Sequence, residues 1–320
     1  MNRTHSNRDL PPRVRGLWLL VAALLVGCGP GEPPEVIESE PDSEVATVAS
    51  DPGDRPIALV TGSTAGLGRA LALRLADDGM HVIVHGRDEE RGMELVRAIE
   101  EEGRGSAHFL AADFASLDEV RALADRIRSD YDRLELLVNN AGVGPGAPGH
   151  ERVLTPDGNE LRFQVNYLAG YLLTRELIPL LEAGAPSRVV NVASRNQQSI
   201  DFDDLRFDEG YQGGRAYGRS KLAQILHVKD LAEALGDRGI LAYAVHPAPA
   251  MDTGLVRETG STPQSTVEEG LEAVYRVATE GDLPNGAYFH ELEQAPAHDD
   301  AYDEAIRREL REASERLVGS

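Results

Sequence analysis

The chain reads Thr61-Gly62-Ser63-Thr64-Ala65-Gly66-Leu67-Gly68 between the apolar run Ile57–Val60 and the helical stretch Arg69–Asp78. Glycines in such a turn let the backbone approach a pyrophosphate closely. The N-terminus of the next helix offers unpaired N–H groups and a positive dipole to the same anion. A glycine turn alone is equally compatible with a structural role, so it predicts a nucleotide site only together with other features.

A second motif follows further along the chain, in Tyr217-Gly218-Arg219-Ser220-Lys221. Its phenol and its ammonium group are four residues apart and therefore share one face of a helix. A surface helix pair has the same spacing. Taken together with the glycine turn, and in this order, the pair predicts an oxidoreductase that uses a nicotinamide cofactor.

The composition excludes several classes of protein. The net charge is −22, and binding to nucleic acid requires a basic face, so no nucleic-acid partner is expected. The single cysteine excludes an internal disulfide and a cysteine-rich metal site. The nine histidines lack metal-ligand spacing, so we expect no metal and favour satisfied structural roles for His81, His85 and His246.

The first residues predict an export signal. A region with four arginines precedes the ten apolar residues Leu17–Val26. This run is too short to span a bilayer, which needs about 20 residues, but it suits a secretory signal core. Leu25-Val26-Gly27-Cys28 resembles the lipobox of bacterial lipoproteins, in which the cysteine is diacylated and becomes the mature N-terminus. Residues 1–27 are therefore predicted as a lipoprotein-type signal peptide and Cys28 as the lipidation site of a membrane-anchored, periplasm-facing protein.

Two alternatives stay open for this segment. Cys28 could be a buried cysteine beside a short apolar helix. The true start of translation could also lie further downstream, which would make the protein cytoplasmic.

Residues 28–55 are predicted to form a disordered tether. Between Gly29 and Arg55 there are eight acidic residues, five prolines and no aromatic residue. Such a segment cannot bury enough apolar surface to offset the entropy of ordering. Because anionic headgroups repel an acidic chain, attachment to a membrane would rely on acyl chains on Cys28.

From Pro56 onward, apolar runs alternate with helical periods. This alternation is typical of a single α/β domain, here residues 56–320, with a doubly wound parallel sheet of Rossmann type. Such sheets bind ligands at the carboxyl ends of their strands. The predicted strands are Ile57–Val60, His81–His85, Ala107–Ala111, Leu134–Val138, Arg188–Val192, Ile240–Val245 and Ala287–Phe289. The predicted helices are Gly66–Asp78, Glu89–Glu101, Leu117–Tyr131, Gly158–Leu181, Ala216–Leu235, Val267–Thr279 and Tyr302–Leu317.

Residues 56–320 resemble the short-chain dehydrogenase/reductase family. The motifs that carry the resemblance are the glycine turn at 61–68, Asp113, Asn139-Asn140-Ala141-Gly142, Asn166, Ser194 and the Tyr217/Lys221 pair. The chain is similar in particular to the retinol dehydrogenase-like branch of this family. That closer resemblance rests on the segments 157–168, 188–194, 220–226 and 286–289.

The resemblance implies a catalytic set of Asn166, Ser194, Tyr217 and Lys221. Tyr217 would be the general acid/base, and since a free phenol has a pKa of about 10 it needs a neighbouring cation, which Lys221 supplies one helical turn away. Lys221 would also bind the nicotinamide ribose. Ser194 would hydrogen-bond the substrate oxygen where negative charge develops. Asn166 would hold a water that relays protons to Lys221.

The end of the second strand decides the type of cofactor. Gly86 stands where an acidic residue would accept the ribose hydroxyls of NAD. Arg87 follows and suits the 2′-phosphate of NADP, so we expect NADP rather than NAD, with Asp88 as the cap of the next helix. The resemblance places Asp113 beside the adenine. The full expected cofactor set is Gly62, Ser63, Thr64, Gly66, Leu67, Gly68, Arg87, Asp113, Asn140, Ala141, Gly142, Tyr217, Lys221 and Thr253.

One segment departs from the family pattern. The family often has His-Pro-Gly followed by a threonine near the nicotinamide amide, whereas this chain has His246-Pro247-Ala248-Pro249 and its threonine, Thr253, comes one residue late. Ala248 loses the left-handed conformations of glycine, and Pro249 stiffens the loop. The departure leaves open whether Thr253 contacts the nicotinamide. We expect the substrate to lie under residues 251–264.

Two classes of function follow from these features. The first is NADP-linked interconversion of a small apolar aldehyde or ketone with its alcohol. The second is a membrane-tethered nucleotide-binding module of the same fold without turnover. The intact catalytic set favours the enzyme, whereas the export signal favours the module, because nicotinamide cofactors are scarce outside the cytoplasm. The sequence is compatible with a homo-oligomer but does not specify one.

Overall fold

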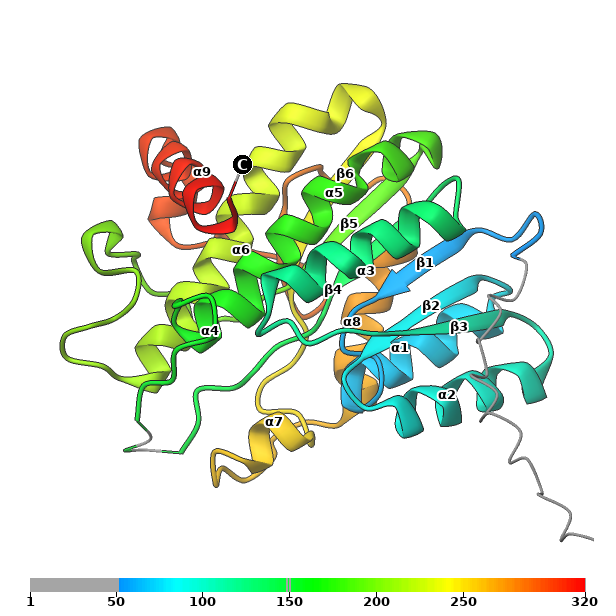
Figure 1. Cartoon of the computed structure of the whole chain (residues 1–320), viewed down its shortest axis with the longest axis horizontal. Coiled ribbons are helices and arrows are strands. Elements are labelled where there is room, and N and C mark those ends of the chain that lie inside the picture. Colours follow the sequence, from blue (N-terminus) through cyan, green and yellow to red (C-terminus); the bar gives the residue numbers. More distant parts are fainter. Residues whose placement is uncertain (1–51, 148, 150, 320) are drawn as a thin grey trace, which may run out of the picture. The chain divides into compact units, whose positions relative to one another are not determined.

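The computed structural model of the chain describes residues 52–319, except 148 and 150 (Figure 1). The described residues belong to one compact unit. The predicted signal peptide, Cys28 and the predicted tether up to residue 51 lie outside the described residues.

The core of the fold is an eight-stranded sheet with the strand order β3-β2-β1-β4-β5-β6-β7-β8. The first seven strands are parallel, and β8 pairs antiparallel with β7. The order reverses between β1 and β4, which creates the switch point where such sheets bind ligands. The predicted single α/β domain with a doubly wound sheet is therefore confirmed. The strands are β1 Ile57–Val60, β2 His81–Gly86, β3 Ser106–Ala111, β4 Leu136–Asn139, β5 Ser187–Val192, β6 Ile240–His246, β7 Tyr288–His290 and β8 Glu293–Gln294.

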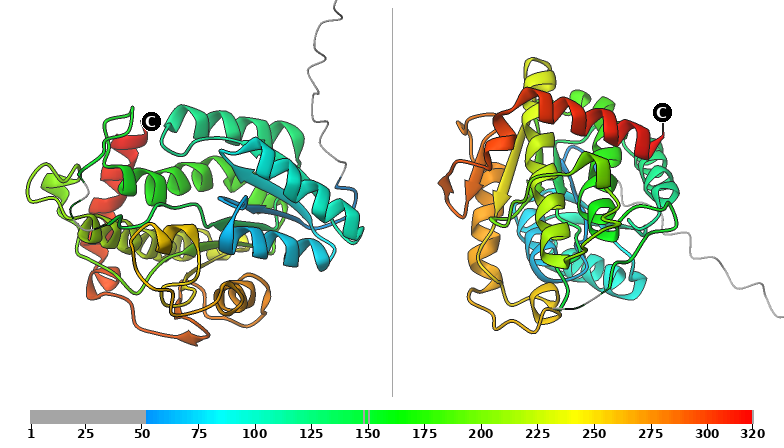
Figure 2. Two further views of the ribbon diagram at one scale, coloured as in Figure 1. Left: turned by 90° about the horizontal axis from the view of Figure 1, so that it is seen from below. Right: turned by 90° about the vertical axis from the view of Figure 1, so that its left-hand side faces the viewer.

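Helices cover both faces of this sheet (Figures 1 and 2). One apolar core joins the sheet to α3, α5 and α6, and a second core on the opposite face joins it to α1, α2 and α8. Successive residues of β1 contribute alternately to the two cores, as the period of a strand requires. The long helices are α1 Gly66–Asp77, α2 Glu89–Glu102, α3 Leu117–Asp130, α5 Ala169–Ala183, α6 Gly213–Leu235, α8 Val267–Thr279 and α9 Glu304–Val318. The short ones are α4 Leu161–Phe163, η1 Gln164–Leu168, η2 Phe202–Asp204, η3 Gly236–Arg238, α7 Gly254–Arg257 and η4 Asp299–Tyr302.

The structure corrects the predicted helix Gly158–Leu181. Residues 155–159 form a hydrogen-bonded turn, and the Glu160 side chain then caps α4 by accepting the Phe163 N–H at 2.9 Å. One π-helical turn, η1, follows before α5 begins. A π turn inserts a residue into the helical repeat and often accompanies a functional site. Because η1 is only five residues long, the shift that it causes in the apolar period does not stand out in the sequence, and it was not predicted.

The C-terminal helix α9 packs against α6. Arg307 of α9 donates to Asp230 at 3.0 Å and to both carboxylate oxygens of Glu233 at 2.6 and 2.7 Å. The hydroxyl groups of Tyr167 and Ser314 are 2.7 Å apart. None of the described helices has the length and apolar character needed to cross a membrane.

Candidate functional site

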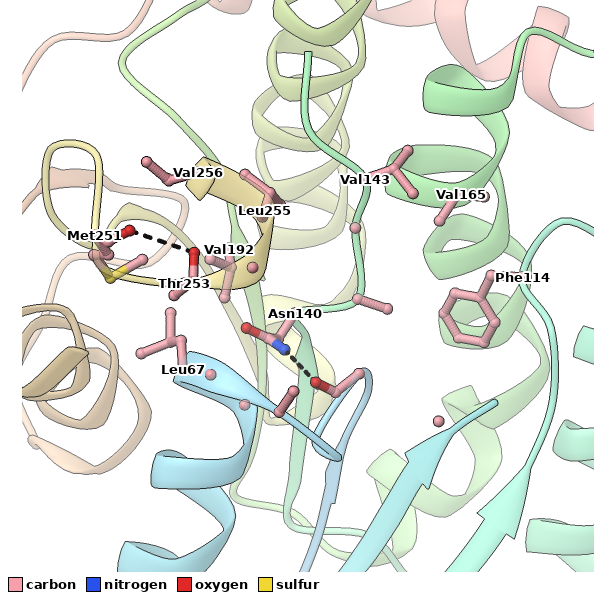
Figure 3. A pocket seen from close by; sticks show the side chains of 18 of the residues that line it. Leu67, Phe114, Asn140, Val143, Val165, Val192, Met251, Thr253, Leu255 and Val256 are labelled. Carbon is pink, nitrogen blue, oxygen red and sulfur yellow. Dashed lines mark hydrogen bonds between the residues drawn. The ribbon is translucent and has the colours of Figure 1, made fainter. Parts of the chain in front are cut away.

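A cleft of about 940 Å³ opens at the carboxyl ends of the parallel strands (Figure 3). Most of the predicted site residues line it. These are Gly62, Thr64, Gly66, Leu67, Gly68, Arg87, Asp113, Asn140, Ala141, Gly142, Ser194, Tyr217, Lys221 and Thr253. Two predicted residues, Ser63 and Asn166, lie behind the wall of the cleft. The switch point thus gathers motifs that are far apart in the sequence.

The glycine turn is pressed against the residues that follow β4. Gly62 has a φ of +64°, and a Cβ placed on it would lie 2.8 Å from the Cα of Ala141. A Cβ on Gly68 would lie 2.5 Å from both the Gly62 carbonyl oxygen and the Asn140 Nδ2. Because α1 begins without a side-chain cap and without an acidic residue in its first turn, its N-terminal N–H groups remain available to an anion.

Thr61 holds the two segments together, although sequence analysis did not include it among the site residues. Its hydroxyl oxygen accepts the backbone N–H groups of Asn140 and Ala141, both at 3.0 Å. In return, the Asn140 amide donates to the Thr61 carbonyl at 2.8 Å. Ser63 is fully buried, and its backbone N–H donates to the His85 carbonyl at 2.9 Å, so it ties the turn to β2.

His85 lies under the turn and also lines the cleft. Its Nδ1 accepts the Gly62 N–H at 3.2 Å, and its Nε2 donates to the Ala112 carbonyl at 3.2 Å. Burial lowers the pKa of His85 from 6.5 to about 4, so the ring is neutral at neutral pH. The satisfied structural role predicted for His85 is confirmed. Its hydrogen-bond partners, Gly62 and Ala112, were not predicted, because they follow from the proximity of β2 to the turn and to the end of β3.

The end of β2 carries the residues expected to select the cofactor. A Cβ on Gly86 would lie 2.5 Å from the Thr64 Cγ2, so a larger residue there requires the Thr64 side chain to move. Asp88 caps α2 by accepting the Arg91 N–H at 3.1 Å, which confirms its predicted role. The Arg87 guanidinium is 3.7 Å from the Asp113 carboxylate, and their side chains are 70% and 40% exposed. An exposed pair of this kind contributes little, so Arg87 is free to turn toward a phosphate.

Ser194, Tyr217 and Lys221 meet in the cleft. The Lys221 Nζ lies 5.5 Å from the centre of the Tyr217 ring and donates to the Val192 carbonyl at 2.7 Å. It also donates to Gln224 Oε1 at 2.9 Å, a partner not predicted from the sequence. Burial lowers the pKa of Lys221 to about 7. Desolvation raises the pKa of Tyr217, and a hydrogen bond with Ser194 acts in the opposite direction.

Asn166 lies in the π turn η1 and forms hydrogen bonds with the loop at Val143 and with helix α6. Its Oδ1 accepts the Val143 N–H at 2.7 Å, and its Nδ2 donates to the Val143 carbonyl at 3.1 Å. The same Nδ2 is 2.9 Å from the hydroxyl oxygen of Ser220, one residue before Lys221. These contacts hold the wall behind Lys221, while the predicted water relay stays a prediction.

The altered segment after β6 closes the other side of the cleft. Thr253 lines it, with its N–H donating to the Met251 carbonyl at 2.7 Å, and its Cγ2 would be 3.3 Å from a Cβ on Gly66. Whether Thr253 contacts the nicotinamide stays a prediction. His246 is buried with a pKa lowered to about 4, but its Nε2 has no hydrogen-bond partner among the described residues. The expected satisfied role is therefore wrong for this nitrogen.

Part of the cleft lining is apolar. Side chains from three separate segments contribute to it, and Figure 3 shows several of them around the opening. They are Val143, Leu161, Val165, Met251, Leu255 and Val256. This lining favours a ligand with an apolar body.

Comparisons with known proteins agree with this geometry. The sequence pattern of the family described as short chain dehydrogenase matches residues 56–264. The chain is 36% identical over 286 residues to retinol dehydrogenase 13 of Homo sapiens, covering 82% of this chain and 84% of that protein. It is also 36% identical over 286 residues to polyprenol dehydrogenase of Mus musculus, with the same coverage of 82% and 84%. The solved structure of a short chain dehydrogenase from Burkholderia cenocepacia in complex with NADP has a TM-score of 0.60 and 28% identity, covering 74% of this chain and 95% of that one.

We expect Gly68→Ala to weaken the binding of a nicotinamide dinucleotide. The new methyl group would lie 2.5 Å from a backbone oxygen, so the turn must shift away from Asn140. Overpacking of this kind costs about 1–3 kcal/mol. Titration of cofactor fluorescence and thermal unfolding measure the two effects. Gly214→Ala is the matched control, because a Cβ there meets nothing within 4 Å. Unchanged affinity in Gly68→Ala would contradict the role of the turn.

Proposed function

Because the chain belongs to the short-chain dehydrogenase family, we propose that it is an NADP(H)-dependent oxidoreductase that interconverts an apolar aldehyde or ketone with its alcohol. The observation that carries the proposal is the meeting of Ser194, Tyr217 and Lys221 in the same cleft as the glycine turn. The bound cofactor would supply or accept the hydride at the carbonyl carbon.

The side chains of the protein would manage the proton and the charge on the substrate oxygen. Tyr217 would donate its phenolic proton to the carbonyl oxygen during reduction and take a proton from the alcohol during oxidation. Ser194 would donate a hydrogen bond to the same oxygen as negative charge develops there. In its charged form, Lys221 favours the phenolate at a distance of 5.5 Å from the ring centre. A lysine with a pKa of about 7 can change charge within the neutral range.

The preference for NADP rests on the end of β2. Gly86 leaves this end without a carboxylate to bind ribose hydroxyls, and Arg87 provides a guanidinium that matches a phosphate. Arg91 also lines this part of the cleft, although sequence analysis did not name it. The Burkholderia relative in complex with NADP supports the same choice.

The substrate class rests on the apolar lining and on the relatives. Retinol and polyprenol, which appear in the relatives' names, are alcohols with apolar bodies. We also propose that a lipid anchor on Cys28 keeps the enzyme at a membrane in which such substrates dissolve. If the anchor is absent because translation starts downstream, the same chemistry would take place in the cytoplasm.

The first test concerns the choice of cofactor. We expect the full chain to bind NADPH more tightly than NADH, and Arg87→Ala to weaken NADPH selectively, because the 2′-phosphate loses its partner. Fluorescence titration with both cofactors measures this. Arg104→Ala is the control, since Arg104 forms a comparably exposed ion pair with Asp77 outside the cleft. Equal affinity of the wild type for the two cofactors would overturn the NADP assignment.

The second test concerns turnover. Tyr217→Phe should lower kcat by about 10²- to 10⁴-fold with cofactor affinity nearly unchanged, because the phenol acts on the substrate oxygen. Lys221→Ala should reduce both turnover and cofactor affinity. A screen of apolar aldehydes, ketones and alcohols, followed by the absorbance of the reduced cofactor, provides the rates. A wild type that binds NADPH but converts none of these compounds would favour a nucleotide-binding module without turnover.

The third test concerns anchoring. Cys28→Ser should abolish incorporation of a labelled fatty acid and leave an unprocessed precursor, because the thiol is the only acceptor in the lipobox-like segment. Mass spectrometry of the native N-terminus and membrane fractionation give the result. Acylation that persists in Cys28→Ser would rule out the lipobox interpretation, and a mature chain that begins downstream of Cys28 would favour the cytoplasmic alternative.

A further inference from the structure

Arg162 lies behind the substrate side of the cleft and is almost completely buried. Its side chain is 7% exposed, and that of its ion-pair partner Glu160 is 1% exposed, with 3.2 Å between Nη1 and Oε1. Burial of a guanidinium costs desolvation free energy unless its N–H groups find hydrogen-bond acceptors. Its remaining N–H groups donate to backbone carbonyls of the loop at 144–145 and to the Tyr211 hydroxyl. The guanidinium therefore connects three separate segments of the chain.

The loop that Arg162 contacts directly follows Asn140–Gly142, which are among the expected cofactor-binding residues. Arg162 Nε donates to the Gly144 carbonyl at 2.9 Å, and Nη2 donates to the Pro145 carbonyl at 3.1 Å. Asn166, four residues later, binds both backbone groups of Val143. Two side chains from the α4–η1 segment therefore hold three consecutive residues of the loop.

This loop forms one wall of the apolar part of the cleft. Val143 lines the cleft directly. A Cβ on Gly144 would lie 3.1 Å from Leu255 Cδ2, so the loop also packs against α7, whose Leu255 lines the cleft as well. A shift of the Gly144 and Pro145 carbonyls would therefore move both of these lining residues.

Arg162 is connected to the catalytic helix as well. Its Nη1 donates to the Tyr211 hydroxyl at 2.5 Å, and that hydroxyl donates to Glu160 at 3.2 Å. Tyr211 lies just before α6, which carries Tyr217 and Lys221. A Cβ on Gly213, the first residue of α6, would lie 2.1 Å from the Pro145 carbonyl oxygen. The loop carbonyl that Arg162 holds is thus in contact with the start of this helix.

We propose that Arg162 is a positioning residue that fixes the substrate wall at Val143–Pro145 relative to the catalytic helix α6. It acts through these segments and does not line the cleft itself. The planar fork of arginine can reach two carbonyls and a hydroxyl at once, whereas the single ammonium of lysine cannot. The expected effect of Arg162 substitutions on substrate binding rests on the proposed function, whereas their expected effect on the mobility of the loop does not.

The test compares the full chain with Arg162→Met, Arg162→Lys and the control Arg307→Met. Arg307 is a suitable control because its side chain is only 8% exposed and pairs with Asp230 and Glu233, but it joins α9 to α6 and does not line the cleft. Measurements are kcat and KM for the best apolar substrate, NADPH affinity, thermal unfolding, and amide hydrogen exchange of residues 141–147.

We expect Arg162→Met to lower kcat/KM by about 10- to 100-fold, mainly through KM, because misplaced positioning groups cost this much. NADPH affinity should stay within about twofold, because the phosphate-binding turn is held by Thr61 and His85 instead. Exchange at residues 141–147 should become faster, and Arg162→Lys should be intermediate. Arg307→Met should lower thermal stability but change neither KM nor exchange at 141–147.

Several results would overturn the proposal. One is unchanged exchange at 141–147 in Arg162→Met, and another is an equal rise of KM in Arg307→Met. Arg162→Met could fail to fold because Glu160 is left as an unpaired buried charge. In that case the double variant Glu160→Gln/Arg162→Met, which lacks this charge, replaces Arg162→Met in the same measurements. If the wild type turns over no substrate, the proposed function fails, while the exchange data still decide the role of Arg162.

Discussion

The cleft depends on a close approach between two backbone segments that leaves no space for a side chain. The glycine turn after β1 and the Asn140–Gly142 segment after β4 touch at Gly62 and Gly68, where any Cβ would meet backbone atoms or the Asn140 amide. Because β1 and β4 flank the switch point, this contact decides where the first N–H groups of α1 point. The Thr61 hydroxyl and the neutral His85 ring hold the turn in that position. The glycine turn, where phosphates are proposed to bind, and the Asn140–Gly142 segment are therefore held together as one unit.

The end of the cleft with the proposed catalytic residues is organised differently, by helices together with the end of β5. Tyr217 and Lys221 lie one turn apart on α6, and the π turn beside α6 carries Asn166, which contacts Ser220. The ammonium group of Lys221 is held by the last carbonyl of β5 and by Gln224, so its position is fixed before any ligand arrives. Arg162 and Asn166 then connect the helices to the loop at Val143–Pro145. The side chains at this end are therefore held in place by hydrogen bonds between separate segments of the chain.

The sequence predicted those features that depend on local chemistry. The glycine turn, the Asp88 cap and the strand–helix alternation follow from backbone freedom, capping and periodicity over a few residues, and each of them is present. The features it missed depend on partners far away in the chain. His85 bonds to Gly62, Arg162 bonds to Gly144 and Tyr211, and Ser63 faces β2 instead of the cleft. No spacing within one segment encodes such pairs. The resemblance supplied the proposed catalytic residues, but not the contacts that hold them.

A chain with a net charge of −22 can still present a favourable field to an anionic dinucleotide, because charge acts over short distances in salt solution. The helices α2, α3, α8 and α9 all carry acidic residues in their first turn, where these neutralise the helix dipole. The first turn of α1, which faces the cleft, has none. The carboxylates that line the same end, Asp88 and Asp113, are each paired with an arginine. The helices α5 and α6 also lack acidic residues in their first turns, so this feature is not particular to α1. What distinguishes α1 is that its uncapped first turn lines the cleft beside the glycine turn, so the overall charge and the charge at this end of the cleft are set by different residues.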